Sequence, residues 1–351
     1  MSRADARNAL AYAAKLTVAK TLVWTGAMSL RRRTALRRHA AVLAYHRVLP
    51  DGSDTASHPG IVVSPETFDR QMSVLKREFR PLTLAEFETH ISARRPFEPG
   101  ACLVTFDDGW IDTFTTAWPI LEKYAIPAVV FLPTNYIGTG RVFWQETLGH
   151  RLLHARHVAR DDAAQMSGIG RALDACGLAG LAGVVARGSR PELLEAIRRL
   201  KLDPVLDPGL AIAALDDALG AGAGQLPLDR FMTWDEVRAL AQRGLAFGAH
   251  GHTHHILSRM AGGELTTDLE MARDAMTREL GTRPTALSYP NGGWNDEVTA
   301  AAAAAQFRTG FTMDRGHVSA DDAPFALRRM NIHDGLTRDA ALFRGRVLGI
   351  F

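Results

Sequence analysis

The sequence predicts an α/β fold in which a mainly parallel sheet closes toward a barrel and helices cover its outside. Seven short apolar runs have the length of strands, at 42–46, 102–108, 128–133, 245–251, 286–292, 307–311 and 326–332. Helical patterns lie between several of these runs, and this alternation is typical of parallel strands joined by crossover helices. Seven candidate strands favour barrel-like closure over a small open sheet.

Two of the separating helices carry end signals. The helix expected after Ser64 has a capping residue and a proline, Pro65, at its first position. A second helix is expected over 266–280, with Thr266 or Thr267 as its cap and Gly281 just beyond its end.

The region from about 141 to 227 differs in composition from the rest of the chain. It is rich in Ala, Leu and Arg, contains a helix-like run at 190–200, and includes the small-residue stretch 220–225 near its end. We expect a mainly helical insertion at about 141–227, ending in a flexible linker. The insertion would interrupt a single domain that covers residues 40–351.

The first 39 residues form a basic segment. It holds nine Lys or Arg side chains against one acid, so it carries +8, and the remaining chain carries −5 within the formal net charge of +3. Its apolar stretch 9–30 is interrupted by Lys15 and Lys20, unlike a signal peptide or a membrane-spanning helix. We expect an amphipathic helix over 1–39. It would either lie on an anionic membrane surface through residues 9–38 or pack on the domain.

Composition also bears on partners and compartment. The sequence lacks the interleaved basic and aromatic residues that are typical of nucleic-acid-binding segments, so we expect no nucleic acid as a partner. The two cysteines, Cys102 and Cys176, fit a reducing compartment. We therefore expect the cytoplasm or the cytoplasmic face of a membrane, with an extracytoplasmic protein on an uncleaved anchor as the alternative.

Two adjacent carboxylates, Asp107 and Asp108, follow the apolar run that begins at Cys102. Like charges so close repel, and one of the two should resist ionising unless a cation lies nearby. Functional groups collect at the carboxyl ends of parallel strands, which is where this pair falls. The pair therefore indicates a cation site.

Four histidines, His250, His252, His254 and His255, follow another strand-like run and supply further ligands. The spacing of His250 and His254 lets two imidazoles converge on one ion. Two imidazole nitrogens and one carboxylate leave positions open for water and substrate, as in sites for zinc or another divalent metal. We interpret His252 and His255 as surface or hydrogen-bonded residues.

A turn-like segment over 286–296 is the third candidate element. Pro290 stiffens it, and Gly292 and Gly293 allow the backbone to approach a ligand closely. The backbone N–H of Asn291 could stabilise an oxyanion. The same residues also make an ordinary turn.

Together these segments resemble the motifs of the polysaccharide deacetylase family, the NodB-homology group of carbohydrate esterase family 4. The sequence TFDDG at 105–109 is similar to the first motif, His250-x-x-x-His254 to the second, and SYPNG at 288–292 to the third. The likeness extends to segments at 43–48, 63–76 and 234–250 and covers about two thirds of the chain.

The resemblance implies a distorted (β/α) barrel of seven or eight strands. It also implies metal-dependent removal of an N- or O-acetyl group from a sugar of an exopolysaccharide or lipid-linked glycan. Mapped onto this sequence, Asp107 is the general base, and the metal ligands are Asp108, His250 and His254. Zinc is the expected ion, with cobalt or nickel as alternatives, and Asn291 is the oxyanion donor.

The general acid has two candidates. In a branch of the family that deacetylates exopolysaccharides, an early Tyr-His segment supplies it, and Tyr45-His46 resembles that segment. Other branches use a late histidine, for which His333 is the counterpart. We favour His46.

Two departures from the family pattern concern positioning. Ser288 stands where the third motif usually carries the arginine that orients the base, and Arg328 or Arg329 is the expected replacement. Gly251 replaces the usual Ser or Thr after the first metal histidine.

Two other function classes are the alternatives. A degenerate family member would bind glycan, or organise a polysaccharide-assembly complex, without turnover. A different metal hydrolase, such as a phosphoesterase, would need more ligands for a two-metal site, and His252 is the only spare ligand nearby.

Overall fold

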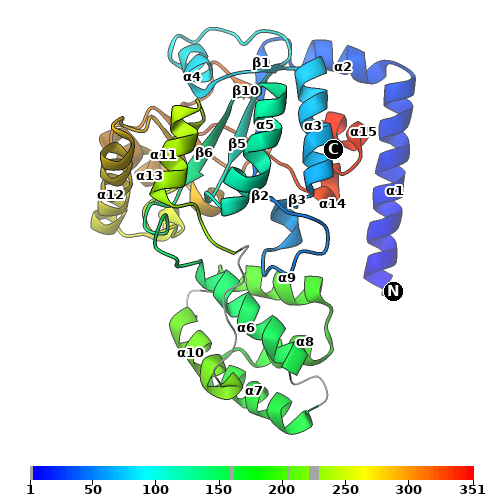
Figure 1. Ribbon diagram of the computed structural model, residues 1–351. Coiled ribbons are helices and arrows are strands. Elements are labelled where there is room, and N and C mark those ends of the chain that lie inside the picture. Colours follow the sequence, from blue (N-terminus) through cyan, green and yellow to red (C-terminus); the bar gives the residue numbers. More distant parts are fainter. Residues whose placement is uncertain (1–2, 159–161, 204–205, 221–228) are drawn as a thin grey trace. The chain divides into compact units, whose positions relative to one another are not determined.

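The computed structural model describes residues 3–158, 162–203, 206–220 and 229–351, with side chains from residue 10 onward, in two compact units (Figure 1). The first unit comprises Met1–Asp51, Ile61–Thr139 and Phe231–Phe351. The second comprises Gly52–Gly60 and Gly140–Arg230. The linker expected at 220–225 falls, apart from Gly220, outside the described residues.

A curled parallel sheet forms the centre of the first unit. Its strands are neighbours in the order β1 (His39–Tyr45), β5 (Ala101–Phe106), β6 (Ala128–Leu132), β7 (Ala246–Ala249), β8 (Ala286–Ser288) and β9 (Thr309–Phe311). At the β1 edge of the sheet, β11 (Met330–Asn331) pairs with β1 in parallel. At the β9 edge, Leu327 forms a parallel bridge to Phe311 of β9. The chain from Leu327 to Asn331 therefore connects the two edges. The predicted distorted (β/α) barrel is confirmed, as is a strand within each of the seven predicted runs.

Shorter strands join this framework. These are β10 (Val318–Ser319), which is antiparallel to β1, β4 (Arg80–Pro81), which is parallel to β5, and the pair β2 (Arg47–Val48) and β3 (Val62–Val63). Each has only two residues, too few for a periodic pattern, so the sequence did not indicate them.

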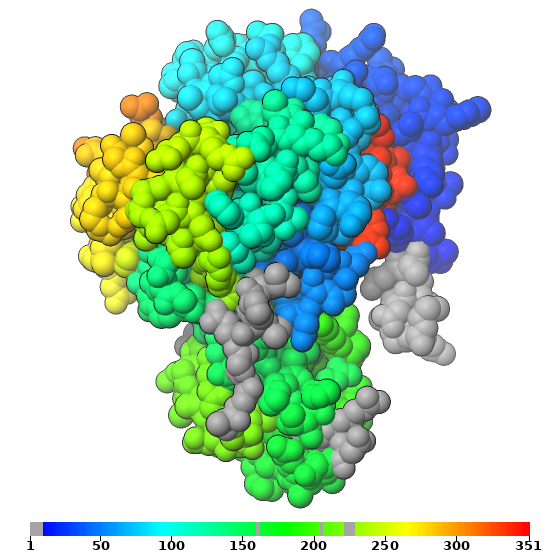
Figure 2. Space-filling model, viewed as in Figure 1, coloured from blue at the N-terminus to red at the C-terminus, as the bar shows by residue number. Residues whose placement is uncertain are grey.

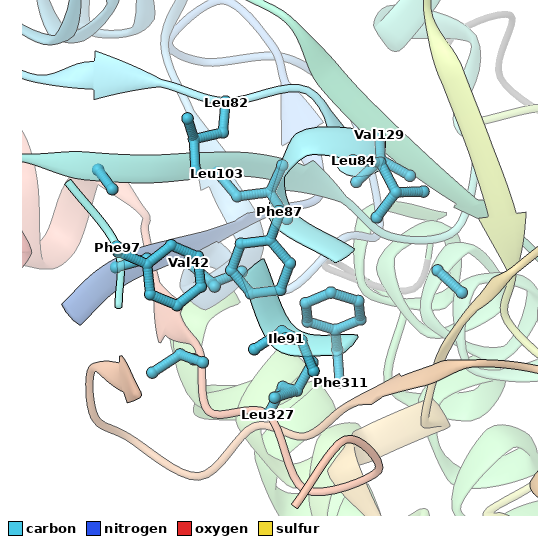
Figure 3. Close-up of a cluster of buried hydrophobic side chains, with 14 of the residues drawn as sticks. Val42, Leu82, Leu84, Phe87, Ile91, Phe97, Leu103, Val129, Phe311 and Leu327 are labelled. Carbon is cyan, nitrogen blue, oxygen red and sulfur yellow. The ribbon is translucent and has the colours of Figure 1, made fainter. Parts of the chain in front are cut away.

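Apolar side chains fill the barrel interior (Figure 3). Alternate residues of each strand point inward, and the helix α4 (Leu84–Ser92) adds apolar side chains to the same cluster. The labelled members are Val42, Leu82, Leu84, Phe87, Ile91, Phe97, Leu103, Val129, Phe311 and Leu327. Because side chains alternate, Leu103, Thr105 and Asp107 share one face of β5 and its extension, which places Asp107 at the carboxyl end of the interior.

Helices cover the outside of the barrel. The helices α3, α5 and α11 lie along one side, and α12 and α13 continue the ring (Figure 1). Their bounds, with those of the remaining helices, are α3 (Pro65–Glu78), α5 (Trp118–Tyr124), α11 (Trp234–Gln242), α12 (Gly262–Leu280), α13 (Asp296–Ala304), α14 (Asp334–Thr337) and α15 (Ala340–Val347). Short turns of helix occur at η1 (Pro59–Ile61), η2 (Thr113–Ala117), η3 (Leu257–Arg259) and η4 (Pro290–Gly292).

The predicted helix ends are partly right. Ser64 is the N-cap residue of α3, as expected, although its hydroxyl donates to Thr67 Oγ1 and accepts no hydrogen bond from a backbone amide of the first turn. The expected start of α12 at Thr266 or Thr267 is wrong, because the helix begins at Gly262. Both threonine hydroxyls donate to backbone carbonyls four residues earlier, so they are satisfied inside the helix. Gly281 ends α12 with a φ of 69°, as expected.

The second unit is helical around its own core. It contains α6 (Trp144–Val158), α7 (Ala163–Ala175), α8 (Ala179–Arg187), α9 (Arg190–Leu200) and α10 (Pro208–Leu219). Leu148, Leu152, Ile169 and Leu193 are among its buried side chains. The segment 52–60 also belongs here. It is held by Asp229, which accepts hydrogen bonds from Thr55 Oγ1 (2.6 Å) and the Ala56 amide (3.3 Å).

The N-terminal segment forms two helices and not the single expected one. These are α1 (Arg3–Trp24) and α2 (Ala27–Ala35), separated at Gly26, whose φ of 75° interrupts the helical backbone. One face of α1 packs on α15, with Ala19 against Ala341 and Leu342. Figure 2 shows this segment in blue beside the red C-terminal helix. Within the described ranges, no helix combines the length and hydrophobicity needed to cross a membrane.

Candidate active site

Polar side chains meet where the barrel strands end. Asp107 and Asp108 follow β5, His250 follows β7, Ser288 ends β8 and His46 follows β1. Since these strands run parallel, their carboxyl ends lie at one end of the barrel. The fold thus brings together residues that are up to 242 positions apart in the sequence.

Asp108, His250 and His254 form a cluster able to hold a metal ion, with one potential ligand atom from each residue within 4.8 Å of the others. Oδ1 of Asp108 lies 3.5 Å from His250 Nε2 and 3.2 Å from His254 Nε2. Asp108 and His250 are buried and His254 is half-buried. This is the triad that the resemblance implied.

Hydrogen bonds to residues outside the triad leave the ligand atoms of Asp108 and His250 directed into the cluster. The backbone carbonyl of Ser288 lies 2.7 Å from His250 Nδ1, and since a carbonyl only accepts, Nδ1 carries the proton and Nε2 is left as a ligand. Trp110 Nε1 donates to Asp108 Oδ2 at 3.1 Å, which leaves Oδ1 toward the histidines. Burial raises the pKa of Asp108, but the hydrogen bond to His254 and the nearby histidines outweigh it and lower the pKa well below its usual value.

The loop between the two ligand histidines is held by one buried carboxylate. Asp268 of α12 accepts hydrogen bonds from the His252 amide (2.7 Å), the Thr253 amide (2.8 Å) and the Thr253 hydroxyl (2.6 Å). Gly251 has a φ of 68°, and a Cβ there would lie 2.9 Å from Asp268 Oδ2. Glycine therefore fits this position in the present chain, and Thr253 supplies a hydroxyl to the same loop.

The other two histidines of the run lie apart from the triad. His252 Nδ1 is 2.8 Å from Thr134 Oγ1, and His255 is exposed. Both placements agree with their interpretation as hydrogen-bonded or surface residues.

Asp107 faces a buried arginine. Arg329 donates from Nη1 to Asp107 Oδ1 and from Nη2 to Asp107 Oδ2, each at 2.7 Å. The Ser288 hydroxyl accepts from Arg329 Nη2 (2.8 Å) and donates to Asp107 Oδ2 (3.3 Å). Burial raises the pKa of Asp107, but the charge and hydrogen bonds of Arg329, together with the nearby His250 and His46, outweigh burial and lower the pKa to about 2. Of the two arginines expected near the base, Arg329 lies there and Arg328 is exposed.

His46 is the histidine beside the base. Its Nε2 lies 3.8 Å from Asp107 Oδ2, and its buried Nδ1 makes no hydrogen bond with a described residue. Burial lowers the pKa of His46, and with Arg329 and His250 it outweighs the two aspartates, which raise that pKa. His333 follows β11, the strand paired with β1, and is half-buried.

Asn291 lies in η4 with a φ of 58°, and its side chain is exposed. Among the described residues, none accepts a hydrogen bond from its backbone N–H. This donor is available to a ligand.

Three supporting residues were not identified from the sequence. The Arg47 guanidinium stacks on Trp110 at 4.2 Å from the ring centroid, and Asp112 binds Arg47 at 2.9 Å. Both charged groups are buried, so they fix the indole that donates to Asp108. Asp112 is five positions after Asp107 of the first motif, and this proximity is the sequence feature that could have identified it. No sequence feature marks Asp268, which lies in α12.

The sequence matches a family model and a relative from Bacillus subtilis. A family model for polysaccharide deacetylases matches residues 94–170 and 215–310. YxkH of Bacillus subtilis (strain 168), named as a polysaccharide deacetylase, is 18% identical over 300 residues, which are 85% of this chain and 73% of YxkH.

Two solved structures share the fold. IcaB from Ammonifex degensii matches with a TM-score of 0.56 at 17% identity, covering 88% of this chain and 97% of IcaB. The Streptococcus pyogenes deacetylase PplD, solved in complex with acetate, matches with a TM-score of 0.54 at 18% identity, covering 86% of this chain and 95% of PplD.

Proposed function

Because this chain belongs to the polysaccharide deacetylase family and is therefore a deacetylase acting on glycans, we propose that it removes N-acetyl groups from an exopolysaccharide or a lipid-linked glycan with a bound divalent metal ion. The observation that carries the proposal is the division of the aspartate pair. Asp107 faces Arg329, whereas Asp108 faces His250 and His254.

The residues present fit a zinc ion, with cobalt or nickel as substitutes. Two imidazole nitrogens and one carboxylate oxygen form a donor set that zinc accepts, with coordination positions left open. Burial lowers the pKa of His250 below 6.5, so its imidazole is neutral at pH 7, which is the form that binds metals. A metal ion held there would lower the pKa of a water molecule and polarise an acetyl carbonyl.

Asp107 accepts the proton of the attacking water in this proposal. It is ionised at neutral pH because Arg329 and the nearby histidines outweigh burial and hold its pKa at about 2, and it adjoins the ligand Asp108 in the chain. The bidentate contact with Arg329 also fixes the orientation of the carboxylate. Arg329, the residue before β11, thus replaces the missing arginine of the third motif, and the base keeps its support.

His46 transfers the proton to the leaving nitrogen. The oxygen of water forms a bond to the acetyl carbon, the carbon–nitrogen bond breaks, and the amine needs one proton. His46 Nε2 and Asp107 Oδ2 are 3.8 Å apart, which is longer than a hydrogen bond, so His46 would receive the proton that Asp107 accepts through one bridging water molecule. His333 is the alternative donor. The Asn291 N–H stabilises the oxyanion.

The experiment is acetate release from N-acetylated oligosaccharides and N-acetylated lipid-linked sugars. We expect release that stops with a chelator and returns when zinc or cobalt is added, with no turnover of phosphoesters. Acetate release unaffected by complete metal removal would overturn the metal-dependent mechanism. Bound metal without acetate from any of these substrates would favour a glycan-binding protein without turnover.

A further inference from the structure

The helix α1 has two unlike faces. Its inner face carries Tyr12, Leu16 and Ala19, which pack on α15 and the C-terminal residues. Its outer face carries five residues at positions i, i+4, i+7, i+11 and i+14, a spacing that puts them in one stripe. All five are exposed, and we call them the outer stripe: Leu10, Ala14, Thr17, Thr21 and Trp24.

The outer stripe carries no charge, and its hydroxyl groups donate hydrogen bonds to backbone carbonyls within the helix. Thr17 Oγ1 donates to the Ala13 carbonyl at 3.0 Å, and Thr21 Oγ1 donates to the Thr17 carbonyl at 2.9 Å. Their methyl groups are left for contact with a partner. Leu10 is 73% exposed and Trp24 88% exposed, the latter more than any other large apolar side chain in the described ranges.

The same segment has a surplus of positive charge. Residues 10–38 contain no Asp or Glu. Lys20 lies 3.8 Å from Asp339, and Arg32 donates to the Glu78 carbonyl. Five further cations form no ion pair with any residue that the structure describes: Lys15, Arg31, Arg33, Arg37 and Arg38.

We propose that the outer stripe and four arginines, Arg31, Arg33, Arg37 and Arg38, dock this protein on an anionic membrane surface. An interface helix places apolar side chains and a tryptophan at the acyl boundary, and its cations attract anionic headgroups. Each Lys or Arg near such a surface contributes about 1 kcal/mol. The stripe extends about 21 Å at 1.5 Å per residue, which suits a helix lying flat.

Lipid fits this surface better than a second copy of the chain. Two copies joined through α1 would bring two basic segments together, since residues 10–38 contain Lys and Arg side chains and no carboxylate. The inference does not depend on the proposed function, because no active-site residue belongs to α1 or α2.

The test is co-sedimentation of the full chain with vesicles of phosphatidylcholine alone or with 30% phosphatidylglycerol. We expect binding to the anionic vesicles, weakened at least tenfold in high salt. Leu10→Ser with Trp24→Ser should weaken binding about tenfold or more, and so should Arg31→Gln with Arg33→Gln. The matched control is Met271→Ser, which changes an exposed apolar residue of α12 and should leave binding intact.

Thermal unfolding of each variant shows whether α1 still packs on α15. Vesicle binding by both double variants at the level of the unchanged protein, or no binding by the unchanged protein, would overturn the proposal. The outer stripe would instead be assigned to a second copy if the unchanged protein dimerises without binding vesicles, and if Leu10→Ser with Trp24→Ser abolishes that dimer.

Discussion

The guanidinium of Arg329 binds both oxygens of Asp107 at 2.7 Å, and neither side chain is more than 3% exposed. Removing one member of a buried pair leaves an uncompensated charge, which costs about 3–5 kcal/mol unless the group changes its protonation. The pair is therefore more than a structural contact, because it keeps the base ionised beside another carboxylate.

Arg329→Met should keep the Asp107 carboxyl protonated to higher pH, because burial would then no longer be opposed by the guanidinium. We expect turnover to fall and the acidic limb of its pH profile to move upward. Arg329→Lys should restore part of the activity. Arg328→Met, at the exposed neighbouring position, is the control, and an unchanged profile in Arg329→Met would contradict this role.

His46→Ala should lower kcat by roughly 10²–10⁴-fold while metal content is retained, since general acid catalysis contributes about that much. His333→Ala at the end of the adjacent strand should have a smaller effect. Acetate release and metal analysis on both variants decide between the two. A larger loss in His333→Ala would transfer the role to His333.

Asp268→Asn should weaken metal binding about 10–100-fold, as expected when a group that orients a ligand loop is altered. The carboxylate accepts two amide hydrogen bonds and one hydroxyl hydrogen bond from residues 252–253, and an amide side chain has one accepting oxygen fewer. Competition with a coloured chelator measures the affinity. Glu270→Gln, at an exposed position of the same helix, should behave like the unchanged protein.

Stability should fall as the pH drops below about 6.5, in part because of His317. Burial lowers its pKa, and His39, Arg31 and Arg315 lower it further, while the Val347 carbonyl accepts a hydrogen bond from Nε2 at 2.9 Å. The unfolded chain therefore takes up a proton first. The stability is complete above pH 6.5 and is lost as the pH falls through that value toward the lower folded pKa.

The check for His317 is urea unfolding at pH 7.5 and 5.5. His317→Gln should show a smaller difference in the free energy of unfolding between the two pH values. Some pH dependence of the free energy of unfolding should remain in His317→Gln, because His46 and His250 also have lowered pKa values. An equal difference in both proteins would rule out the contribution of His317.

The sequence predicts features that lie within one local run better than contacts between residues that are far apart in the chain. The strands and the ligands Asp108, His250 and His254 lie in local runs whose pattern is visible, so the fold and the candidate cluster could be predicted. The partner of Asp107 could not be assigned to Arg328 or Arg329, because the choice depends on how the chain at 327–331 pairs with β1 and β9. Only the folded barrel shows that alternate residues Leu327 and Arg329 face inward.

Asp268 and the break at Gly26 were missed for related reasons. Asp268 acts through backbone amides 15 and 16 positions away, and no side-chain motif marks such a contact. Gly26 interrupts an otherwise helical pattern at one residue, and glycine alone is a weak signal for the end of a helix.

The most direct test of the account is the same substitution at the two adjacent aspartates, Asp107→Asn and Asp108→Asn, with zinc content and acetate release measured on each. We predict that Asp107→Asn retains stoichiometric zinc and loses turnover, whereas Asp108→Asn loses zinc and turnover together. Full activity of Asp107→Asn, or zinc retained by Asp108→Asn at the level of the unchanged protein, would contradict the division of roles.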